Sequence, residues 1–364
     1  MKVLITGASG FIGKNLILHL SERKDVEILT FTKEENDDVL EERIKKADFI
    51  FHLAGINRPK SDEEFKAGNA DLTLTICNII RKLSKKTPVL YTSSIQAEKT
   101  NPYGISKKLA EDYLLELSSE QGNPVFIYRL PNVFGKWCKP NYNSVVATFC
   151  YNILNDQGVQ VNDPSAVLNL VYVDDVIEAF LSVLDGDKFK NVEPVYVTTV
   201  GDLKSQIEAF KDSKNSLLIE RVGIGLSRAL YSTYISYFTP NQFKYSLVKH
   251  EDPRGVFVEM LKTKDSGQFS FFTAHPGITR GGHYHHTKNE KFLVISGEAK
   301  FGFRHMMTGE KFEILTKGSS PEVVETIPGW THDVTNIGKT EMVVMLWANE
   351  IFDRSKPDTI TSKV

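Results

Sequence analysis

The chain has 364 residues, of which 41% are hydrophobic and 25% charged, with a formal net charge of -2. This length accommodates about two or three domains, and the composition is that of an ordinary globular protein. The near-neutral charge excludes the basic surface with which proteins bind nucleic acid or an anionic membrane. The cysteines Cys77, Cys138 and Cys150 form neither a disulfide framework nor a metal-binding spacing. No apolar run suits a signal peptide or a membrane span, so we expect a cytoplasmic protein without membrane insertion.

A nucleotide-binding pattern opens the chain. Residues 2–6 predict a buried strand, the turn Gly7-x-x-Gly10-x-x-Gly13 follows, and a helical pattern begins at Lys14. Glycines let the backbone approach a pyrophosphate, and a helix N-terminus offers free amide groups and the positive end of the helix dipole. A glycine turn between a strand and a helix is the context that a dinucleotide site requires.

Strand and helix patterns continue to alternate after this turn. Residues 26–31, 48–55 and 88–94 predict strands, and residues 72–83 predict a helix. Such alternation indicates a parallel sheet covered by helices on both faces. Ligands of these sheets bind at the carboxyl ends of the strands, where the glycine turn, Gly55 and Ser94 are expected to meet.

The end of the second predicted strand bears on the choice of cofactor. An NAD site usually has an acidic residue here to hold the ribose hydroxyls. The sequence reads Thr30-Phe31-Thr32-Lys33, with no carboxylate before Glu34. Lys33 and the hydroxyls can accept a 2′-phosphate, so we expect NADPH; the alternative is a solvated loop lysine.

Tyr103 and Lys107 form a candidate catalytic pair on a helix predicted to run to about Leu117. Residues four apart share one helix face. A nearby ammonium favours the phenolate, so we expect Lys107 to lower the pKa of Tyr103 toward a value useful in acid–base catalysis. Ser94 could hydrogen-bond the same substrate oxygen. The alternative is a chance Tyr-x-x-x-Lys on an exposed helix.

Residues 1 to about 245 resemble the extended short-chain dehydrogenase/reductases of the nucleotide-sugar type. The matching pieces are Thr6-Gly7-x-x-Gly10-x-x-Gly13, His52-Leu53-Ala54-Gly55, Asn69, Ser94, Tyr103-x-x-x-Lys107, Arg129-x-Pro-Asn132-Val-Phe-Gly135 and Val171-Tyr-Val-Asp174-Asp175-Val. The resemblance implies a Rossmann-type doubly wound sheet. It also implies that Tyr103 exchanges the hydroxyl proton, Lys107 binds the nicotinamide ribose, and Ser94 steadies the carbonyl.

The same resemblance implies where the ligands bind. The expected cofactor contacts are Thr6, Gly7, Gly10, Phe11, Ile12, Gly13, Lys33, Leu53, Ala54, Gly55, Tyr103 and Lys107, and Asn132 is expected in the nucleotide-sugar pocket. The acidic run of residues 34–38 matches no element of the family.

The character of the sequence changes near residue 243. From Val195 to about Phe238 the pattern is helical, and Thr239-Pro-Asn-Gln then breaks it. Short strands are predicted after the break at residues 257–261, 269–273, 292–295, 300–304, 311–315, 322–327 and 342–347. Such spacing indicates an all-β sandwich or barrel. We therefore expect a reductase domain of residues 1–243 and an all-β domain of residues 244–364.

Four polar side chains of the second half are predicted to converge. His283 and His285 lie on one face of a predicted strand because side chains alternate, and Glu290 opens the next strand. His332, after the turn at Pro328, can supply a fourth group. Two imidazoles and a carboxylate suit zinc or another divalent metal with a position left open for substrate. A histidine-rich surface strand is the alternative.

This half resembles the cupins, through Gly277, His283-x-His285, Glu290, Gly297 and Pro328-Gly-Trp-Thr-His332 with Asn336. Asp252-Pro-Arg254-Gly-Val-Phe-Val-Glu259, Arg280-Gly-Gly-His283-Tyr and Lys291-Phe-Leu-Val also resemble the 4-keto-sugar nucleotide 3,5-epimerases. This implies that His283 is the base that removes a proton beside the sugar carbonyl and that Lys291 stabilises the enolate oxygen. Arg254 and Arg280 are the expected substrate contacts.

The epimerase resemblance divides the histidine cluster. It leaves His285, Glu290 and His332 as metal ligands, with His283 as a fourth ligand the alternative to its role as base. The epimerases bind no metal and have another residue where His285 stands. Their late catalytic tyrosine is not evident here, where Trp347 lies in that neighbourhood.

Together the halves resemble bifunctional capsular-polysaccharide enzymes of the UDP-N-acetyl-L-fucosamine pathway. The resemblance implies C3 epimerisation of a UDP-4-keto-6-deoxy-2-acetamido sugar by the cupin, and then NADPH-dependent reduction to UDP-2-acetamido-2,6-dideoxy-L-talose. Epimerisation comes first because reduction removes the ketone that acidifies the neighbouring proton. The alternatives are a reductase with a non-catalytic, dimerising or sugar-sensing cupin, and a nonenzymatic NADPH-binding regulator. We expect a homodimer, since cupins often pair through strand edges.

Overall fold

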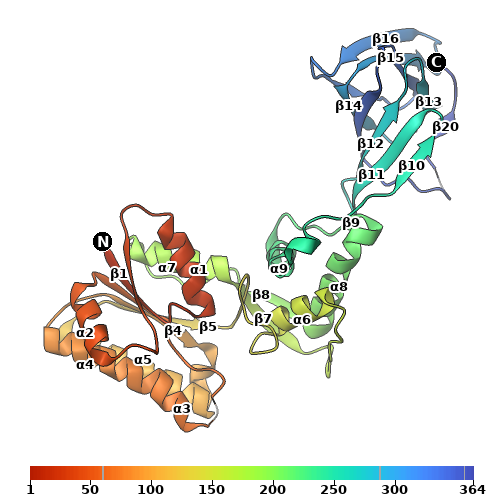
Figure 1. The fold of residues 1–364 in the computed structure, drawn as a ribbon. Coiled ribbons are helices and arrows are strands. Elements are labelled where there is room, and N and C mark those ends of the chain that lie inside the picture. Colours follow the sequence, from red (N-terminus) through yellow and green to blue (C-terminus); the bar gives the residue numbers. More distant parts are fainter. Residues whose placement is uncertain (60, 287, 356) are drawn as a thin grey trace. The chain divides into compact units, whose positions relative to one another are not determined.

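The computed structural model describes residues 1–59, 61–286, 288–355 and 357–364. They form two compact units (Figure 1). The first unit contains Met1–Ile207 and Arg228–Phe238, and the second contains Glu208–Ser227 and Thr239–Val364. Residues 208–227 thus group with the second unit although they precede residue 243, and a domain boundary at that residue stays a prediction.

The first unit is built on a five-stranded parallel sheet with the strand order β2-β1-β3-β4-β5. The strands are β1 (Lys2–Thr6), β2 (Glu27–Phe31), β3 (Phe49–His52), β4 (Val89–Ser94) and β5 (Val125–Leu130). Their apolar sequences suit a sheet that is buried on both faces. Val3, Leu4 and Ile5 of β1, for example, are fully buried. The expected Rossmann-type sheet is confirmed.

Helices cover both faces of this sheet (Figure 1). The helices α2 (Asp37–Lys46), α4 (Leu72–Leu83) and α5 (Pro102–Gln121) contribute to one core cluster, which also includes Ile50 of β3. Phe51, the next residue of β3, points to the other face and contacts the ring of Phe180 in α7 (Val173–Leu184). The helix α1 (Phe11–Ser21) contacts α7. The first unit is therefore doubly wound.

The remaining elements before residue 243 complete the first unit and lead into the second. They are α3 (Glu63–Phe65), the π-helical segment η1 (Lys66–Asp71), the 3₁₀ segment η2 (Ile95–Glu98), β6 (Asn132–Phe134), α6 (Val145–Leu154), β7 (Val167–Tyr172), β8 (Tyr196–Thr199), α8 (Val200–Ser216), β9 (Leu218–Ile219), α9 (Gly225–Ile235) and the 3₁₀ segment η3 (Pro240–Gln242). Strands β6, β7 and β8 form a small separate sheet. None of the described helices is long and apolar enough to cross a membrane.

Two elements differ from the sequence-based expectations. The acidic run that matched no element opens α2, where the Asn36 side chain accepts a hydrogen bond from the Val39 amide at 3.1 Å. Asp37 and Asp38 lie in the first turn of α2, where carboxylates favour a helix. The stretch after Val195, expected to be helical, begins with β8, which pairs with β7. Its tyrosine, valine and threonines favour a strand.

The second unit is built on two sheets, to which the end of α8 and the segment η3 are added (Figure 1). The seven-stranded sheet has the order β10-β11-β12-β19-β14-β17, with β9 beside β11, and the five-stranded sheet has the order β16-β15-β18-β13-β20. The strands are β10 (Lys249–Asp252), β11 (Gly255–Thr263), β12 (Gln268–Ala274), β13 (Thr279–Tyr284), β14 (Glu290–Ser296), β15 (Glu298–His305), β16 (Lys311–Lys317), β17 (Val323–Glu325), β18 (Trp330–Asn336), β19 (Met342–Ala348) and β20 (Ile360–Thr361).

Side chains from both sheets form one hydrophobic core. Phe272, Phe292 and Val344 of the seven-stranded sheet share this core with Phe301 and Val334 of the five-stranded sheet. All the strands predicted after residue 243 are present, and the expectation of an all-β unit after an α/β unit is confirmed.

Candidate functional site

The glycine turn after β1 is shaped by close backbone contacts. Gly7 has a φ of 72°, and a Cβ added there would lie 2.7 Å from the Ala54 nitrogen. A Cβ at Gly13 would lie 2.4 Å from the Gly7 carbonyl oxygen. These positions therefore require glycine and leave the backbone open to a pyrophosphate. The expected cofactor residues Thr6, Gly7, Gly10, Phe11, Ile12 and Gly13 all lie in β1, in this turn or in the first turns of α1.

The loop after β3 connects the glycine turn to the candidate catalytic residues. Leu53, Ala54 and Gly55 form this loop, and the Ala54 amide donates to the Thr6 hydroxyl at 3.2 Å. A Cβ at Gly55 would lie 3.0 Å from the Lys107 Nζ. The structure thus brings the expected cofactor residues from β1 and β3 next to Lys107. The fit of these glycines to an extended dinucleotide is the reason to assign a cofactor here.

Ser94, Tyr103 and Lys107 converge at the carboxyl end of β4. Ser94 ends β4, and its side chain is hydrogen-bonded to that of Tyr103 in α5. Lys107 is only 5% exposed, and its Nζ donates to the Thr92 carbonyl at 2.9 Å. Burial lowers the pKa of Lys107 to about 8, against the opposing charge of Glu111.

The electrostatics of Tyr103 differ from the expectation. Burial raises the pKa of Tyr103, and the hydrogen bond with Ser94 opposes the rise. The predicted lowering by Lys107 is therefore wrong for this structure, because desolvation of the phenolate outweighs the favourable contacts. The side chain is held as a phenol, which is the form that donates a proton.

Two residues near this triad had been missed or left without a role. Asn69 lies in η1, and its side chain donates to the Ile56 carbonyl and to the Ser106 hydroxyl, both at 3.0 Å. It thereby ties the loop after β3 to α5, and π-helical turns are frequent at functional sites. Glu111 is 1% exposed and accepts hydrogen bonds from Ser93 at 2.5 Å and from Arg129 at 2.6 Å. Its position one turn after Lys107 was the available signal.

The end of β2 lies beside charged side chains of the following segment and of α2. Lys33 is exposed beyond the strand. The carboxylate of Glu35 turns back to accept the Thr32 amide at 2.9 Å, and Arg43 of α2 pairs with it at 2.5 Å. A guanidinium–carboxylate pair therefore lies at the Thr32 amide, where the adenosine ribose of a dinucleotide is expected. Asn132, the expected sugar contact, begins β6 and is exposed.

The second site brings together the four groups predicted to converge. His283 lies on β13, Glu290 begins β14, His332 lies on β18, and His285 directly follows β13. One nitrogen or oxygen from each lies within 4.8 Å of all the others. His285, Glu290 and His332 are 2%, 5% and 3% exposed, respectively.

The donor set fits a divalent metal ion. His285 Nε2 lies 3.2 Å, and His332 Nε2 3.3 Å, from the same oxygen of Glu290. Among the described residues, neither ring nitrogen of the buried His332 has a hydrogen-bond partner. A buried polar atom without a partner is costly unless a ligand satisfies it. Neutral imidazoles and one carboxylate are suitable zinc ligands.

Hydrogen bonding and burial set the protonation of this cluster. His285 Nδ1 contacts the Asp358 carbonyl oxygen. Because a carbonyl only accepts, Nδ1 carries a proton, and Nε2, which lies 3.2 Å from the Glu290 carboxylate, is the His285 atom that would bind a metal. Burial lowers the pKa of His283 to about 4, helped by the charge of His332. Burial would raise the pKa of Glu290, but contacts with His285 and His332 hold that pKa well below its usual range.

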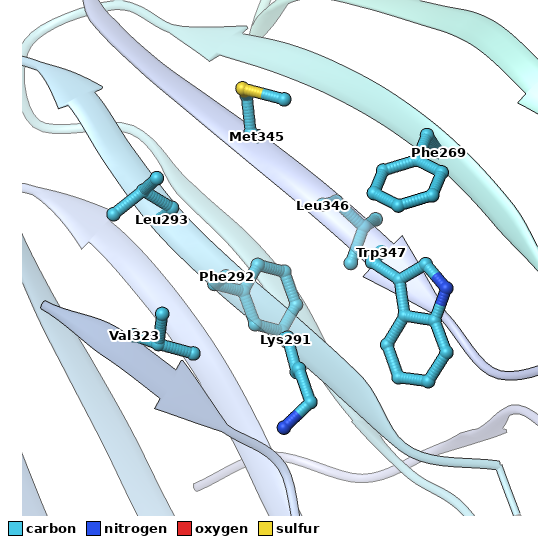
Figure 2. A pocket seen from close by; sticks show the side chains of 8 residues that line it. All are labelled: Phe269, Lys291, Phe292, Leu293, Val323, Met345, Leu346 and Trp347. Carbon is cyan, nitrogen blue, oxygen red and sulfur yellow. The ribbon is translucent and has the colours of Figure 1, made fainter. Parts of the chain in front are cut away.

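The structure does not bring Lys291 into this cluster. Because Glu290 faces inward at the start of β14, strand alternation turns Lys291 to the outer face, where its side chain is 47% exposed and pairs with Glu325. Lys291 lines an apolar hollow of about 380 Å³ together with Phe269, Met345 and Trp347. Figure 2 shows these side chains. The lysine beside the cluster is Lys288, which is 7% exposed with its Nζ 3.2 Å from Glu290. An oxyanion role for Lys291 is not supported by this geometry.

The two expected substrate arginines differ in their surroundings. Arg254, in the β10–β11 turn, is exposed and pairs with Asp252 at 2.6 Å. Arg280 of β13 is partly buried and donates to the Thr273 carbonyl at 2.7 Å. Burial lowers the pKa of Arg280, and the charge of Arg254 adds to the effect. The two guanidinium groups therefore interact electrostatically.

Comparisons with known proteins agree with this division of the chain. Residues 3–197 match the NAD dependent epimerase/dehydratase family, and residues 250–360 match the polysaccharide biosynthesis C-terminal domain. The chain is 58% identical to the UDP-2-acetamido-2,6-beta-L-arabino-hexul-4-ose reductase of Pseudomonas aeruginosa, an alignment that covers 100% of this chain and 99% of the relative.

Solved structures extend the comparison. The capsular polysaccharide assembling protein CapF from Staphylococcus aureus is 44% identical, with a TM-score of 0.93 and 100% of both chains covered. A UDP-glucuronic acid 4-epimerase from Bacillus cereus in complex with NAD is 18% identical, with a TM-score of 0.56. The match covers 65% of this chain and 98% of the epimerase, and it shows that the α/β part shares the fold of that enzyme. The chain therefore belongs to the NAD dependent epimerase/dehydratase family, in the two-domain group of CapF and the Pseudomonas reductase.

Proposed function

We propose that the first unit is an NADPH-dependent 4-ketoreductase of a UDP-linked 6-deoxy-2-acetamido sugar. The observation that carries this proposal is the convergence of Ser94, Tyr103 and Lys107 beside the Gly55 loop. The Pseudomonas relative, a reductase of a UDP-2-acetamido hexul-4-ose by name, supports the choice of substrate. The expected product is UDP-2-acetamido-2,6-dideoxy-L-talose for capsular polysaccharide.

Each residue of the triad has a separate role in this reduction. Tyr103, held as a phenol by burial, donates its proton to the C4 oxygen as the carbonyl becomes a hydroxyl. Ser94 hydrogen-bonds the same oxygen and orients it, while Lys107 holds the nicotinamide ribose and its ammonium favours the developing phenolate. The bound dinucleotide supplies the hydride to C4. Asn132 lies in the sugar pocket.

The cofactor choice is tested at Lys33. We expect Lys33→Ala to raise the KM for NADPH about tenfold while leaving that for NADH unchanged, because only NADPH has a 2′-phosphate for the ammonium to contact. The neighbouring Arg43 offers a second cation, so some preference for NADPH should remain. Steady-state kinetics with both cofactors measure this, with Lys45→Ala on the exposed side of α2 as a matched control. Equal affinities of the wild-type enzyme for the two cofactors would contradict the proposal.

We further propose that the second unit is a C3 epimerase that acts before the reduction. His283 removes the proton beside the C4 ketone, and His285, Glu290 and His332 hold a divalent metal, for which zinc is the best fit. The metal, when bound, polarises a carbonyl. Arg254 and Arg280 bind the substrate diphosphate, since guanidinium groups match phosphate geometry. His283 as fourth metal ligand is the alternative, which the 4.8 Å cluster also accommodates.

The combined proposal is tested with the UDP-4-keto-6-deoxy-2-acetamido sugar in D2O. Without NADPH, the wild-type chain should introduce deuterium at C3, and a chelator of zinc should slow that exchange. Added NADPH should then be oxidised with formation of the talose product. Reduction without prior exchange would favour a ketoreductase with a non-catalytic cupin. Exchange without NADPH oxidation would overturn the reductase proposal.

Assembly and localisation complete the proposal. We propose a homodimer in which the apolar hollow on the outer sheet face packs against a second copy (Figure 2). Contiguous exposed apolar surface of this kind is typical of interfaces. A mass of twice the chain mass in a light-scattering measurement would agree with the homodimer, and the mass of a monomer would contradict it.

The proposed localisation is the cytoplasm. The described cysteines are free and buried, which suits this reducing compartment, where UDP-sugars are the proposed substrates.

A further inference from the structure

We infer that the segment of residues 358–364 supports the residues of the candidate metal site and that Asp358 is the positioning residue for His285. This inference rests on the metal-binding role proposed for the histidine cluster. The segment is far from the cluster in sequence, since 73 positions separate His285 from Asp358. It belongs to no motif of the second half.

Asp358 holds both the ligand ring and the loop that follows it. Its backbone carbonyl accepts the Nδ1 proton of His285. Its two carboxylate oxygens accept the backbone amides of His286 and Lys288, each at 2.9 Å. One residue thus contacts the His285 ring and the backbone amides of His286 and Lys288. The same loop carries Lys288, whose Nζ pairs with Glu290.

The rest of the segment contacts the strands that carry the other histidines. Strand β20 pairs with β13, so that Thr361 lies opposite His283. The Ser362 amide donates to the Gly282 carbonyl at 2.9 Å. On the neighbouring strand β18, the fully buried Thr331 lies next to His332 and donates to the Ser362 carbonyl at 2.7 Å. The segment therefore contacts the backbone beside His283, His285 and His332.

A further contact anchors the segment to β15. The Arg304 guanidinium donates to the Lys363 carbonyl at 2.6 Å and to the Ser362 hydroxyl at 2.9 Å. Backbone and side-chain bonds therefore hold the segment against β13, β15 and β18. Such partners behind metal-ligating histidines fix ring orientation and tautomer, and their loss weakens metal binding about 10- to 100-fold.

The decisive experiment measures zinc affinity of the full chain by competition with a chromophoric chelator. We expect Asp358→Ala to raise the zinc Kd about 10- to 100-fold, because the amides of His286 and Lys288 lose their acceptors and no longer fix the position of the backbone carbonyl that orients His285. Asp358→Asn keeps one carbonyl oxygen as an acceptor and should fall between Asp358→Ala and the wild type. NADPH oxidation by the epimerised ketone should stay at the wild-type rate, since the reductase residues lie in the other unit.

Asp353→Ala is the matched control. Asp353 precedes the segment and caps a local turn by accepting from the Ser355 amide at 2.8 Å. This variant should bind zinc like the wild type, and the metal-free forms of both alanine variants should unfold at the same temperature. That last readout separates positioning from general stability.

Three outcomes would overturn the inference. Wild-type zinc affinity in Asp358→Ala would do so while leaving the metal proposal intact. An equal loss of affinity in Asp353→Ala would assign the effect to a general loosening of the C-terminal part of the chain rather than to the contacts of Asp358. A wild-type chain that binds no zinc would overturn both this inference and the metal site on which it rests.

Discussion

Tyr103→Phe is expected to reduce NADPH oxidation by the UDP-4-keto sugar about 10²- to 10⁴-fold and to leave deuterium exchange at C3 unchanged. The substitution removes only the hydroxyl, which in the structure is hydrogen-bonded to Ser94. The ring contact with Phe65, at a centroid distance of 5.5 Å, remains possible for phenylalanine, so the fold should be preserved. Absorbance of NADPH measures the reduction, and mass spectrometry in D2O measures the exchange.

Tyr113→Phe is a suitable control for this variant, because Tyr113 lies on the same helix but packs against the core cluster. It should keep both activities. Loss of both activities in Tyr103→Phe would mean that the two sites are not separate. An undiminished rate of NADPH oxidation would exclude Tyr103 as the proton donor.

His283→Ala is expected to lower deuterium exchange about 10²- to 10⁴-fold, because the proposed base for the C3 proton is removed. The same preparation should still oxidise NADPH with the already epimerised ketone. Zinc content distinguishes the two roles of His283. If His283 is only a base, its removal should leave the zinc content unchanged. If it is a fourth ligand, its removal should lower the affinity for zinc.

His286→Ala provides the comparison for the second variant. Its ring contacts Tyr284 rather than the four-residue cluster, and it is exposed. It should exchange and bind zinc like the wild type. Exchange at the wild-type rate in His283→Ala would remove the base assignment, and loss in His286→Ala alone would move the base to that residue.

The parts of both sites that the sequence predicted are those with a local geometric constraint. The turn at Gly7 requires a positive φ, and the alternation of a strand brings His283 toward the face used by Glu290 and His332. These constraints act over a few residues and can be recognised without the fold. The alternation of strand and helix patterns predicts the parallel sheet, although its strand β5 is not among the predicted strands.

The parts that the sequence did not predict depend on direction or on distant partners. Lys291 directly follows the inward-facing Glu290, and adjacent residues of a strand face opposite sides of the sheet. The lysine expected beside the substrate therefore faces outward. Lys288 lies between two strands, where no periodicity fixes the direction of a side chain. The contact between Asp358 and His285 joins segments that only the folded chain brings together. The pKa of Tyr103 depends on burial, which a helix-face argument does not give.

Strand β14 has two different surroundings. Glu290, Phe292 and Val294 are buried, and Glu290 contacts His285 and His332. Lys291 and Leu293 line the outer hollow (Figure 2). The proposed chemistry therefore constrains the inward-facing Glu290, and the proposed contact between two copies constrains the outward-facing residues of the same strand. A substitution at Lys291 or Leu293 should thus alter the proposed association of two copies while leaving Glu290 beside the histidines unchanged.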